Sequence, residues 1–299
     1  MQLKQLTKKN SNSTYTSLYN IYSMYSEANR TENLSVLMKL VSNESSIEIE
    51  STLLFKNWVT NPKTLGDIAI IQIYVIIQRR IRNIIFDECT NKVPSPAMID
   101  IKENTIKSLL ELNFIQEIMN LLSSSSSTKK DTSILIFVAL SNCKDFLKLL
   151  SYKKFIDRMI QHLNTMKQTQ YVNYKEHIIA TLSILRSIYI KDISLRRIFI
   201  ELNGASILKE FLYCGDYEIV EETIYNIEDL ICGDQEDNVG TTSSLGSIAI
   251  EEMIKELQKI NIEEALFSFE KKNYGIEEEN ELKEDVNKLI LLLSDKGDK

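Results

Sequence analysis

Three side chains near residue 225 could together hold a positively charged group. Glu222 and Asp229 are seven residues apart, and helical spacing places them on one face. Tyr225 lies four residues before Asp229 on the same face, so an aromatic ring would stand beside a carboxylate. A Lys or Arg side chain of a partner can bind both groups, through charge and through the face of the ring. The alternative is that these carboxylates only form a solvated surface.

A second polar candidate is Asn142, which follows the otherwise apolar segment SILIFVALS. One interpretation is that the helix ends there and Asn142 caps it. The other is that Asn142 occupies one position of a repeat and faces a groove. Loss of a cap lowers stability by about 1 kcal/mol, whereas loss of a groove residue would weaken ligand binding instead.

The charge of the chain is divided unevenly. Residues 201–299 carry 25 Asp and Glu against 9 Lys and Arg, whereas residues 1–200 carry 17 against 26. Such an asymmetry describes surfaces and the partners they attract, not the fold. It favours a protein or peptide partner with a basic segment that docks at the acidic C-terminal part, and it does not favour nucleic acid.

No motif predicts catalysis, a cofactor or a metal centre. The two histidines, His162 and His177, have no Cys or acidic neighbours at zinc-type spacing, and we expect both to be partly exposed on helices. A phosphate-binding glycine loop, a GxSxG elbow and an HExxH motif are all missing from the sequence. We therefore expect a non-enzymatic protein without catalytic, cofactor-binding or metal-binding residues.

Composition points to helices and to a reducing compartment. Gly and Pro number only 8 and 3, which argues for helices joined by short polar turns. The four cysteines form no CxxC pair and are expected to be buried thiols. No signal peptide and no membrane span are visible, so we expect a cytoplasmic or possibly nuclear protein.

A repeat must position the candidate residues. The segments ELNF at 111–114 and ELNG at 201–204 each close one helical stretch and precede two more. They are 90 residues apart, and a looser unit lies between them, which gives a period near 45. Asn261 stands where Asn113 and Asn203 stand, and the third helices align with Leu140, Leu185 and Ile227 in one position.

This period predicts an all-α fold, a right-handed superhelix of about five to six three-helix repeats. The repeat domain is expected to span residues 13–293 and to contain a flexible acidic and polar loop at 233–247. Residues 1–12 and 294–299 are polar and are expected to be disordered.

The segment IELNGASILKEFLYCGDYEIVEETIYNIEDLI resembles the consensus of the armadillo-repeat family. The resemblance implies a concave groove in which one amide of each third helix binds the backbone of an extended peptide. The corresponding positions here are Asn57, Asn142, Ser187 and Asp229. The layout is also faintly similar to importin-alpha-type adaptors, which place Trp four residues before that amide. The positions here are Leu53, Val138, Ser183 and Tyr225, so the Trp–Asn array is missing.

We therefore predict a scaffold or adaptor that binds a partner protein or peptide along a groove of helical repeats. The predicted partner-binding residues are Asn57, Asn142, Ser187, Glu222, Tyr225 and Asp229. Two alternatives stay open. The resemblance implies the first, a nucleotide-exchange cofactor of a heat-shock chaperone, because small armadillo proteins of this size embrace the nucleotide-binding domain of such chaperones. The second is a divergent nuclear-transport adaptor.

Overall fold

Helices are the regular elements of this chain wherever the structure describes it. The computed structural model describes residues 27–42, 64–89, 107, 109, 113–141, 152–168, 173–190, 192–233, 244–272, 274–275 and 279–294. The contacts divide the chain into two units, residues 1–150 and 151–299. No helix in these ranges combines the length and the apolar character needed to cross a membrane.

Unit 1 contains four described helices. They are α2 (Leu34–Ser42), α3 (Leu65–Cys89), α5 (Phe114–Leu121) and α6 (Ser127–Ser141). Helix α3 begins with a reciprocal cap, because the Thr64 hydroxyl accepts from the Asp67 amide and the Asp67 carboxylate accepts from the Thr64 amide, both at 3.1 Å. Lys129 of α6 donates to the Val41 carbonyl at the end of α2, at 2.9 Å, which joins distant parts of this unit.

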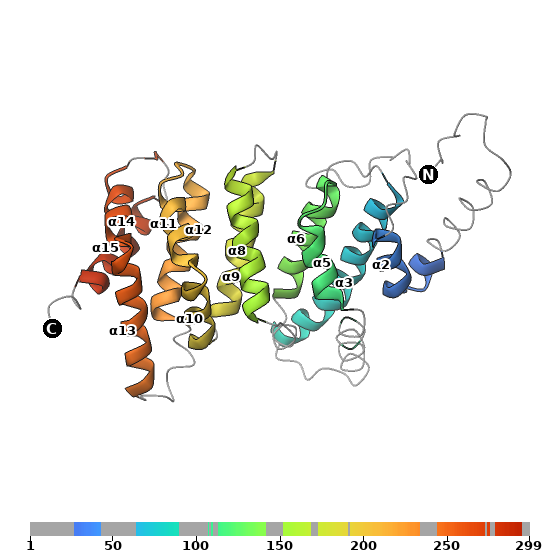
Figure 1. The fold of residues 1–299 in the computed structure, drawn as a ribbon, viewed down its shortest axis with the longest axis horizontal. Coiled ribbons are helices and arrows are strands. Elements are labelled where there is room, and N and C mark those ends of the chain that lie inside the picture. The colour runs from blue at the N-terminus through green and yellow to red at the C-terminus, as the bar shows by residue number, and fades with distance from the viewer. Residues whose placement is uncertain are drawn as a thin grey trace. The chain divides into compact units, whose positions relative to one another are not determined.

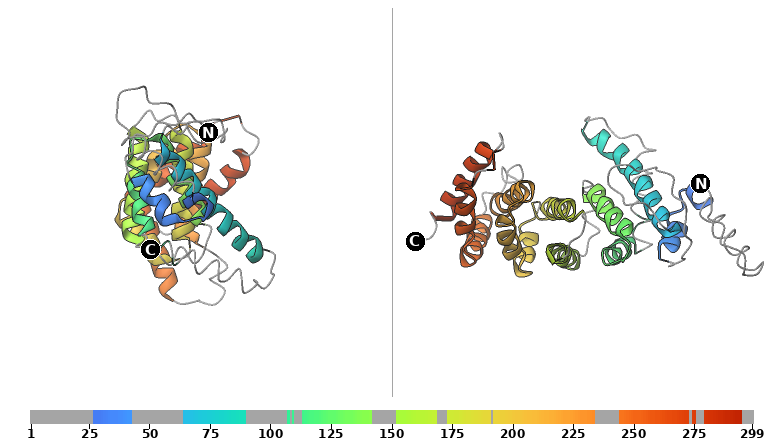
Figure 2. Two further views of the ribbon diagram at one scale, coloured as in Figure 1. Left: turned by 90° about the vertical axis from the view of Figure 1, so that its right-hand side faces the viewer. Right: turned by 90° about the horizontal axis from the view of Figure 1, so that it is seen from above.

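Unit 2 contains eight described helices. They are α8 (Tyr152–Gln168), α9 (Tyr174–Tyr189), α10 (Ile193–Glu201), α11 (Gly204–Leu212), α12 (Tyr217–Cys232), α13 (Ser244–Lys259), α14 (Ile262–Glu270) and α15 (Glu279–Ser294). Figure 1 shows them in three successive groups along the unit: α8 with α9, then α10 to α12, then α13 to α15. In the view from above, α8 and α9 appear end-on as two separate layers (Figure 2).

Two rows of helices run through unit 2. In one row, α8 packs on α11 and α11 packs on α14; in the other, α9 packs on α12 and α12 packs on α15. The first row contains the second helices of the predicted repeats, and the second row contains the third helices. Each group therefore buries its apolar surface against its neighbours, which is how repeat proteins build a continuous core.

The turn before each second helix has the same geometry in three repeats. Asn113, Asn203 and Asn261 have φ angles of 48°, 65° and 53°, in the left-handed region. Asparagine tolerates this conformation better than most residues because its short polar side chain can interact locally. The asparagines that mark the repeat in the sequence thus share one backbone role.

The third helices of unit 2 have the same pattern of buried positions. The matching sets are His177, Thr181, Ile184, Leu185 and Ile188 in α9; Ile219, Thr223, Asn226, Ile227 and Leu230 in α12; and Leu282, Val286, Leu289, Ile290 and Leu293 in α15. Thr181 and Thr223 even make the same hydrogen bond, from the hydroxyl to the carbonyl four residues earlier, at 2.6 Å. Residues 42 apart in α9 and α12 are therefore equivalent.

The ends of α9 and α12 meet at one buried cation. Arg196 of α10 donates to the Tyr189 and Ile190 carbonyls, at 3.1 and 3.0 Å, and so caps α9. Gly233, which lies in the predicted flexible loop, is buried beside the guanidinium of Arg196. Helix α13 begins at Ser244, so the predicted loop is helical from there, and residues 234–243 lie outside the described residues.

Candidate protein-binding site

The predicted cation site lies between α9 and α12 and already holds a cation of this chain. The Arg186 Nε donates to the Asp229 carboxylate, and the guanidinium carbon lies over the Tyr225 ring, 5.3 Å from its centroid. Arg186 belongs to α9, the third helix of the preceding repeat, and Asp229 belongs to α12, the next helix in the same row. The two groups expected to receive a Lys or Arg side chain of a partner therefore receive one from the neighbouring repeat.

Arg186 is held by opposing electrostatic effects. Burial favours the uncharged guanidine, but the hydrogen bond and attraction to Asp229 outweigh it, so the pKa of Arg186 is raised. The Asp229 side chain is 12% exposed and that of Arg186 is 35% exposed. The pair is therefore only partly shielded, and the Arg186 side chain still reaches solvent.

Glu222 lies beside this pair and is partly buried. Its burial raises its pKa to about 7, although Arg186 acts in the opposite direction. The Asn226 side-chain amide donates to the Glu222 carbonyl at 2.7 Å and to its carboxylate at 3.3 Å. Near neutral pH, Glu222 is thus divided between its charged and uncharged forms.

A buried polar contact joins α9 to α12 beneath the site. The Tyr189 hydroxyl donates to the Asn226 carbonyl at 3.1 Å and also contacts the side-chain oxygen of Asn226. Tyr189 is fully buried, and that burial raises its pKa well above its ordinary value, so the hydroxyl stays protonated. This contact fixes the register of the two helices and hence the distance from Arg186 to Asp229.

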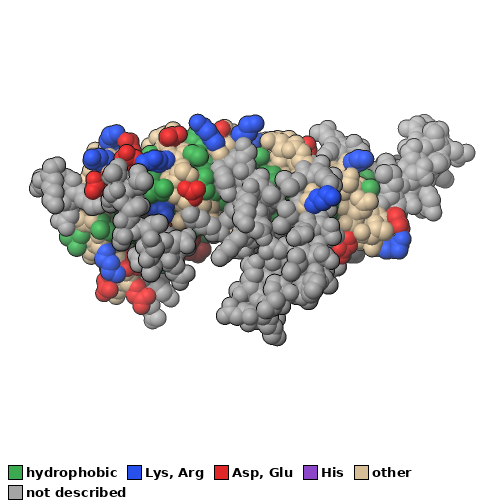
Figure 3. Space-filling view, turned by 90° about the horizontal axis from the view of Figure 1, so that it is seen from below, with side chains coloured by type: hydrophobic (Ala, Val, Ile, Leu, Met, Phe, Trp, Pro, Cys, Tyr) green, Lys and Arg blue, Asp and Glu red, His purple; other side chains and the backbone are tan. Residues whose placement is uncertain are grey.

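More carboxylates extend the site along the row. The Tyr225 hydroxyl donates to Glu221 at 3.5 Å. Burial and the nearby Asp285 of α15 raise the pKa of Glu228. The face of unit 2 shown in Figure 3 is not uniformly acidic, because Lys and Arg side chains lie beside Asp and Glu there.

The structure brings together three of the six predicted site residues, Glu222, Tyr225 and Asp229. Ser187 occupies the position equivalent to Asp229, 42 residues earlier, but its hydroxyl donates to the Ile184 carbonyl of its own helix at 2.8 Å. The predicted roles of Asn57 and Asn142 fall outside the described residues. The partner-binding role of all six stays a prediction.

Two expectations from the sequence are wrong. His162 and His177 were expected to be partly exposed, but both are buried and lie with Nε2 and Nδ1 3.1 Å apart. His177 occupies the core position that Ile219 fills in α12, which explains its burial. Cys214 was expected to be buried, but it is exposed. Within the described ranges, no three His, Cys, Asp or Glu side chains are grouped to hold a metal ion.

Comparison with known proteins identifies the fold. No protein-family model matches the sequence, and no curated protein matches it. The structure is similar to the armadillo repeats only protein from Plasmodium falciparum, with 18% identity over 96% of this chain and 100% of the other and a TM-score of 0.61. It is also similar to a designed armadillo repeat protein in complex with the peptide (KR)4, with 13% identity, coverage of 96% and 97% and a TM-score of 0.56.

A further designed armadillo protein, made for modular peptide recognition, has 12% identity, coverage of 94% of both chains and a TM-score of 0.55. The chain therefore has the armadillo-repeat fold. This confirms the predicted class, an all-α fold of armadillo-type repeats.

Proposed function

We propose that this chain is a non-enzymatic scaffold that binds a protein segment along the third helices of unit 2, and that the segment carries Lys or Arg. The observation that carries the proposal is the contact of Arg186 with Asp229 and Tyr225. A carboxylate and an aromatic face arranged around one guanidinium can bind a Lys or Arg side chain of a basic segment, through a charged hydrogen bond and through the ring.

The electrostatics of the surrounding helix support a cationic segment. Glu221, Glu222 and Glu228 lie on α12 with Asp229, and Asp285 of α15, which is paired with Lys288, lies near Glu228 and Tyr225. An extended basic segment would neutralise several carboxylates at once. Because Arg186 reaches solvent, its side chain can turn away and leave Asp229 and Tyr225 to a cation of the partner.

The designed armadillo proteins add support by analogy. One of them is in complex with the peptide (KR)4, and another was designed for modular peptide recognition. Their fold is that of this chain, but their sequences are 13% and 12% identical to it, so the likeness supports the use of the fold and not individual contacts.

Replacing Arg186 should strengthen the binding of a basic peptide. Arg186→Ala removes the side chain that competes with the peptide for Asp229 and Tyr225. We expect the labelled peptide (KR)4 to bind this variant about tenfold more tightly, which corresponds to about 1.4 kcal/mol of binding free energy. Fluorescence anisotropy measures the affinity. Binding by the parent chain should weaken as salt rises from 0.1 to 1 M, because the Debye length falls from about 10 to about 3 Å.

The matched control is Arg197→Ala, which removes the same charge from an exposed pair with Glu252, outside the site. If both variants change the affinity equally, the effect is one of net charge, and the proposed site does not bind cations. A second pair of variants should act in the opposite direction. Glu222→Gln with Asp229→Asn should weaken binding, whereas Glu201→Gln with Glu251→Gln, at exposed positions outside the site, should change it little.

A further inference from the structure

The side chain that fills the proposed cation site is an arginine, and its contacts depend on the shape of a guanidinium. The Nε of Arg186 donates to the Asp229 carboxylate, while the guanidinium carbon lies over the Tyr225 ring, 5.3 Å from its centroid. A guanidinium is flat and carries its N–H donors around its edge, so one such group can meet a ring and a carboxylate at the same time.

A second carboxylate acts on the same cation. Burial opposes the charge of Arg186, but Asp229 and Glu222 both favour it, and the pKa of the guanidinium is raised as a result. Glu222 and Asp229 are seven residues apart, which is about two helical turns. The donors of a guanidinium are spread over three nitrogens and can serve both carboxylates, whereas a lysine ammonium acts as a point charge.

The site is also partly closed to water, which favours the more weakly hydrated cation. The Asp229 side chain is only 12% exposed, so a cation that binds there gives up part of its water. This loss costs an ammonium more than a guanidinium. Lys167 of α8, whose side chain is 26% exposed, shows the effect, because burial lowers the pKa of its ammonium although Glu210 is its ion-pair partner.

Arg186 is the competitor that a partner must displace. Because it is attached to α9, it has a high effective concentration at the site. An arginine of the partner can make the same hydrogen bond to Asp229 and the same contact with the Tyr225 ring. A lysine offers less than the side chain that it has to replace, so the competition works against lysine.

We infer that this site selects arginine over lysine, and that the bound segment of the partner places an arginine on Asp229 and Tyr225. The inference rests on the proposed function, because it names the residue that the basic segment brings to the site. The partner is then a segment in which this one arginine cannot be replaced by lysine without loss of affinity.

Arg186→Lys tests the inference without changing the net charge of the chain. A lysine attached to α9 should hold the site less firmly than the arginine does. We therefore expect a labelled oligo-arginine peptide, as long as (KR)4, to bind this variant about fivefold more tightly than the parent chain, as measured by fluorescence anisotropy. The matched control is Arg197→Lys at the exposed pair with Glu252, where we expect no change. No gain in Arg186→Lys, or an equal gain in the control, would overturn the inference.

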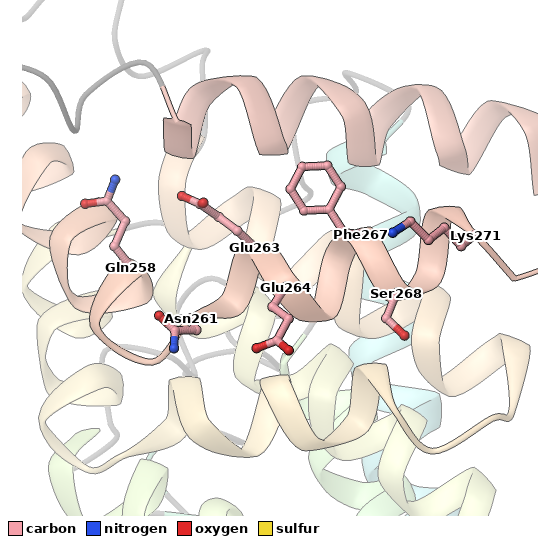
Figure 4. A pocket seen from close by; sticks show the side chains of 7 residues that line it. All are labelled: Gln258, Asn261, Glu263, Glu264, Phe267, Ser268 and Lys271. Atoms are coloured by element: carbon pink, nitrogen blue, oxygen red, sulfur yellow. The ribbon is translucent and has the colours of Figure 1, made fainter.

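An oligo-lysine peptide of the same length measures the selection directly. Arginine can bind better than lysine to any acidic surface, so the ratio of the two affinities is compared between variants. Tyr225→Leu removes the ring from the site, and we expect the preference for oligo-arginine to fall about fivefold. The matched control is Phe267→Leu, which should keep the preference. Phe267 is an exposed ring that also stands four residues from a carboxylate, Glu263, beside an open hollow on α14 and outside the proposed site (Figure 4).

The results separate the inference from the proposed function. If neither peptide binds the parent chain or Arg186→Ala, the proposed function is wrong and the inference falls with it. If both peptides bind, and Tyr225→Leu and Phe267→Leu have the same preference, the chain binds basic segments without selecting arginine, and only the inference is overturned. Circular dichroism should show the variants to be folded like the parent chain. If Tyr225→Leu disturbs α12, Arg186→Lys, which removes no ring, decides the question.

Discussion

Gly233→Ala is expected to lower the free energy of unfolding of unit 2 by about 3 kcal/mol or more. Gly233 has φ 64° and ψ −168°, a conformation that is essentially restricted to glycine. A Cβ atom there would also overlap the guanidinium of Arg196. Arg196 cannot move away without breaking its hydrogen bonds to the Tyr189 and Ile190 carbonyls, which cap α9.

The measurement is urea denaturation followed by circular dichroism, with Gly215→Ala as the matched control. Gly215 has φ 84°, so alanine is strained there as well, but no atom lies within 4 Å of the added Cβ. We expect a cost of only about 1 kcal/mol for the control. Equal losses in the two variants would show that the contact with Arg196 does not constrain the fold.

Glu222→Gln is expected to make the folded chain more stable at pH 8.5, by about 1–3 kcal/mol, and to have little effect at pH 5. The pKa of Glu222 is about 7 in the folded chain, above the ordinary value of 4.5. Below pH 4.5 the carboxyl is protonated in both folded and unfolded chains. Between pH 4.5 and 7 the unfolded chain releases the proton first, so stability falls as the pH rises.

Glutamine removes this pH-dependent cost and can still accept the hydrogen bond from Asn226. The difference between pKa values of 4.5 and about 7 sets an upper limit of roughly 3 kcal/mol, since each pH unit corresponds to about 1.36 kcal/mol. Urea denaturation of parent and variant across pH 5 to 8.5 measures the change. The exposed Glu201→Gln serves as the control, and a stabilisation that does not depend on pH would contradict the role of Glu222.

The fold could be predicted from the sequence because its signals are local and repeated. The asparagines at 113, 203 and 261 mark turns of one geometry, and apolar spacing identifies the helices around them. Both signals need only neighbouring residues. The burial of His177 could also have been predicted, because the repeat aligns it with the buried Ile219. Its polar side chain instead suggested an exposed position.

Only the part of the site that lies on α12 could be predicted from the sequence. Glu222, Tyr225 and Asp229 share a face of one helix, which periodicity reveals. Arg186 comes from another helix, and its contact depends on how far α9 is shifted along α12. Packing sets that shift, through contacts such as the one between Tyr189 and Asn226, and no spacing within a single helix encodes it.

The two rows of helices in unit 2 also determine how the unit folds and unfolds. Every contact in a row joins helices of adjacent groups, so forming the unit does not require its two ends to meet, and folding should be fast for its size. Within unit 2, the group α10 to α12 has a neighbour on each side, whereas α8 with α9 and α13 to α15 each pack on one group. Partial unfolding of the unit should therefore begin at its outer groups and leave α10 to α12 as the most persistent part.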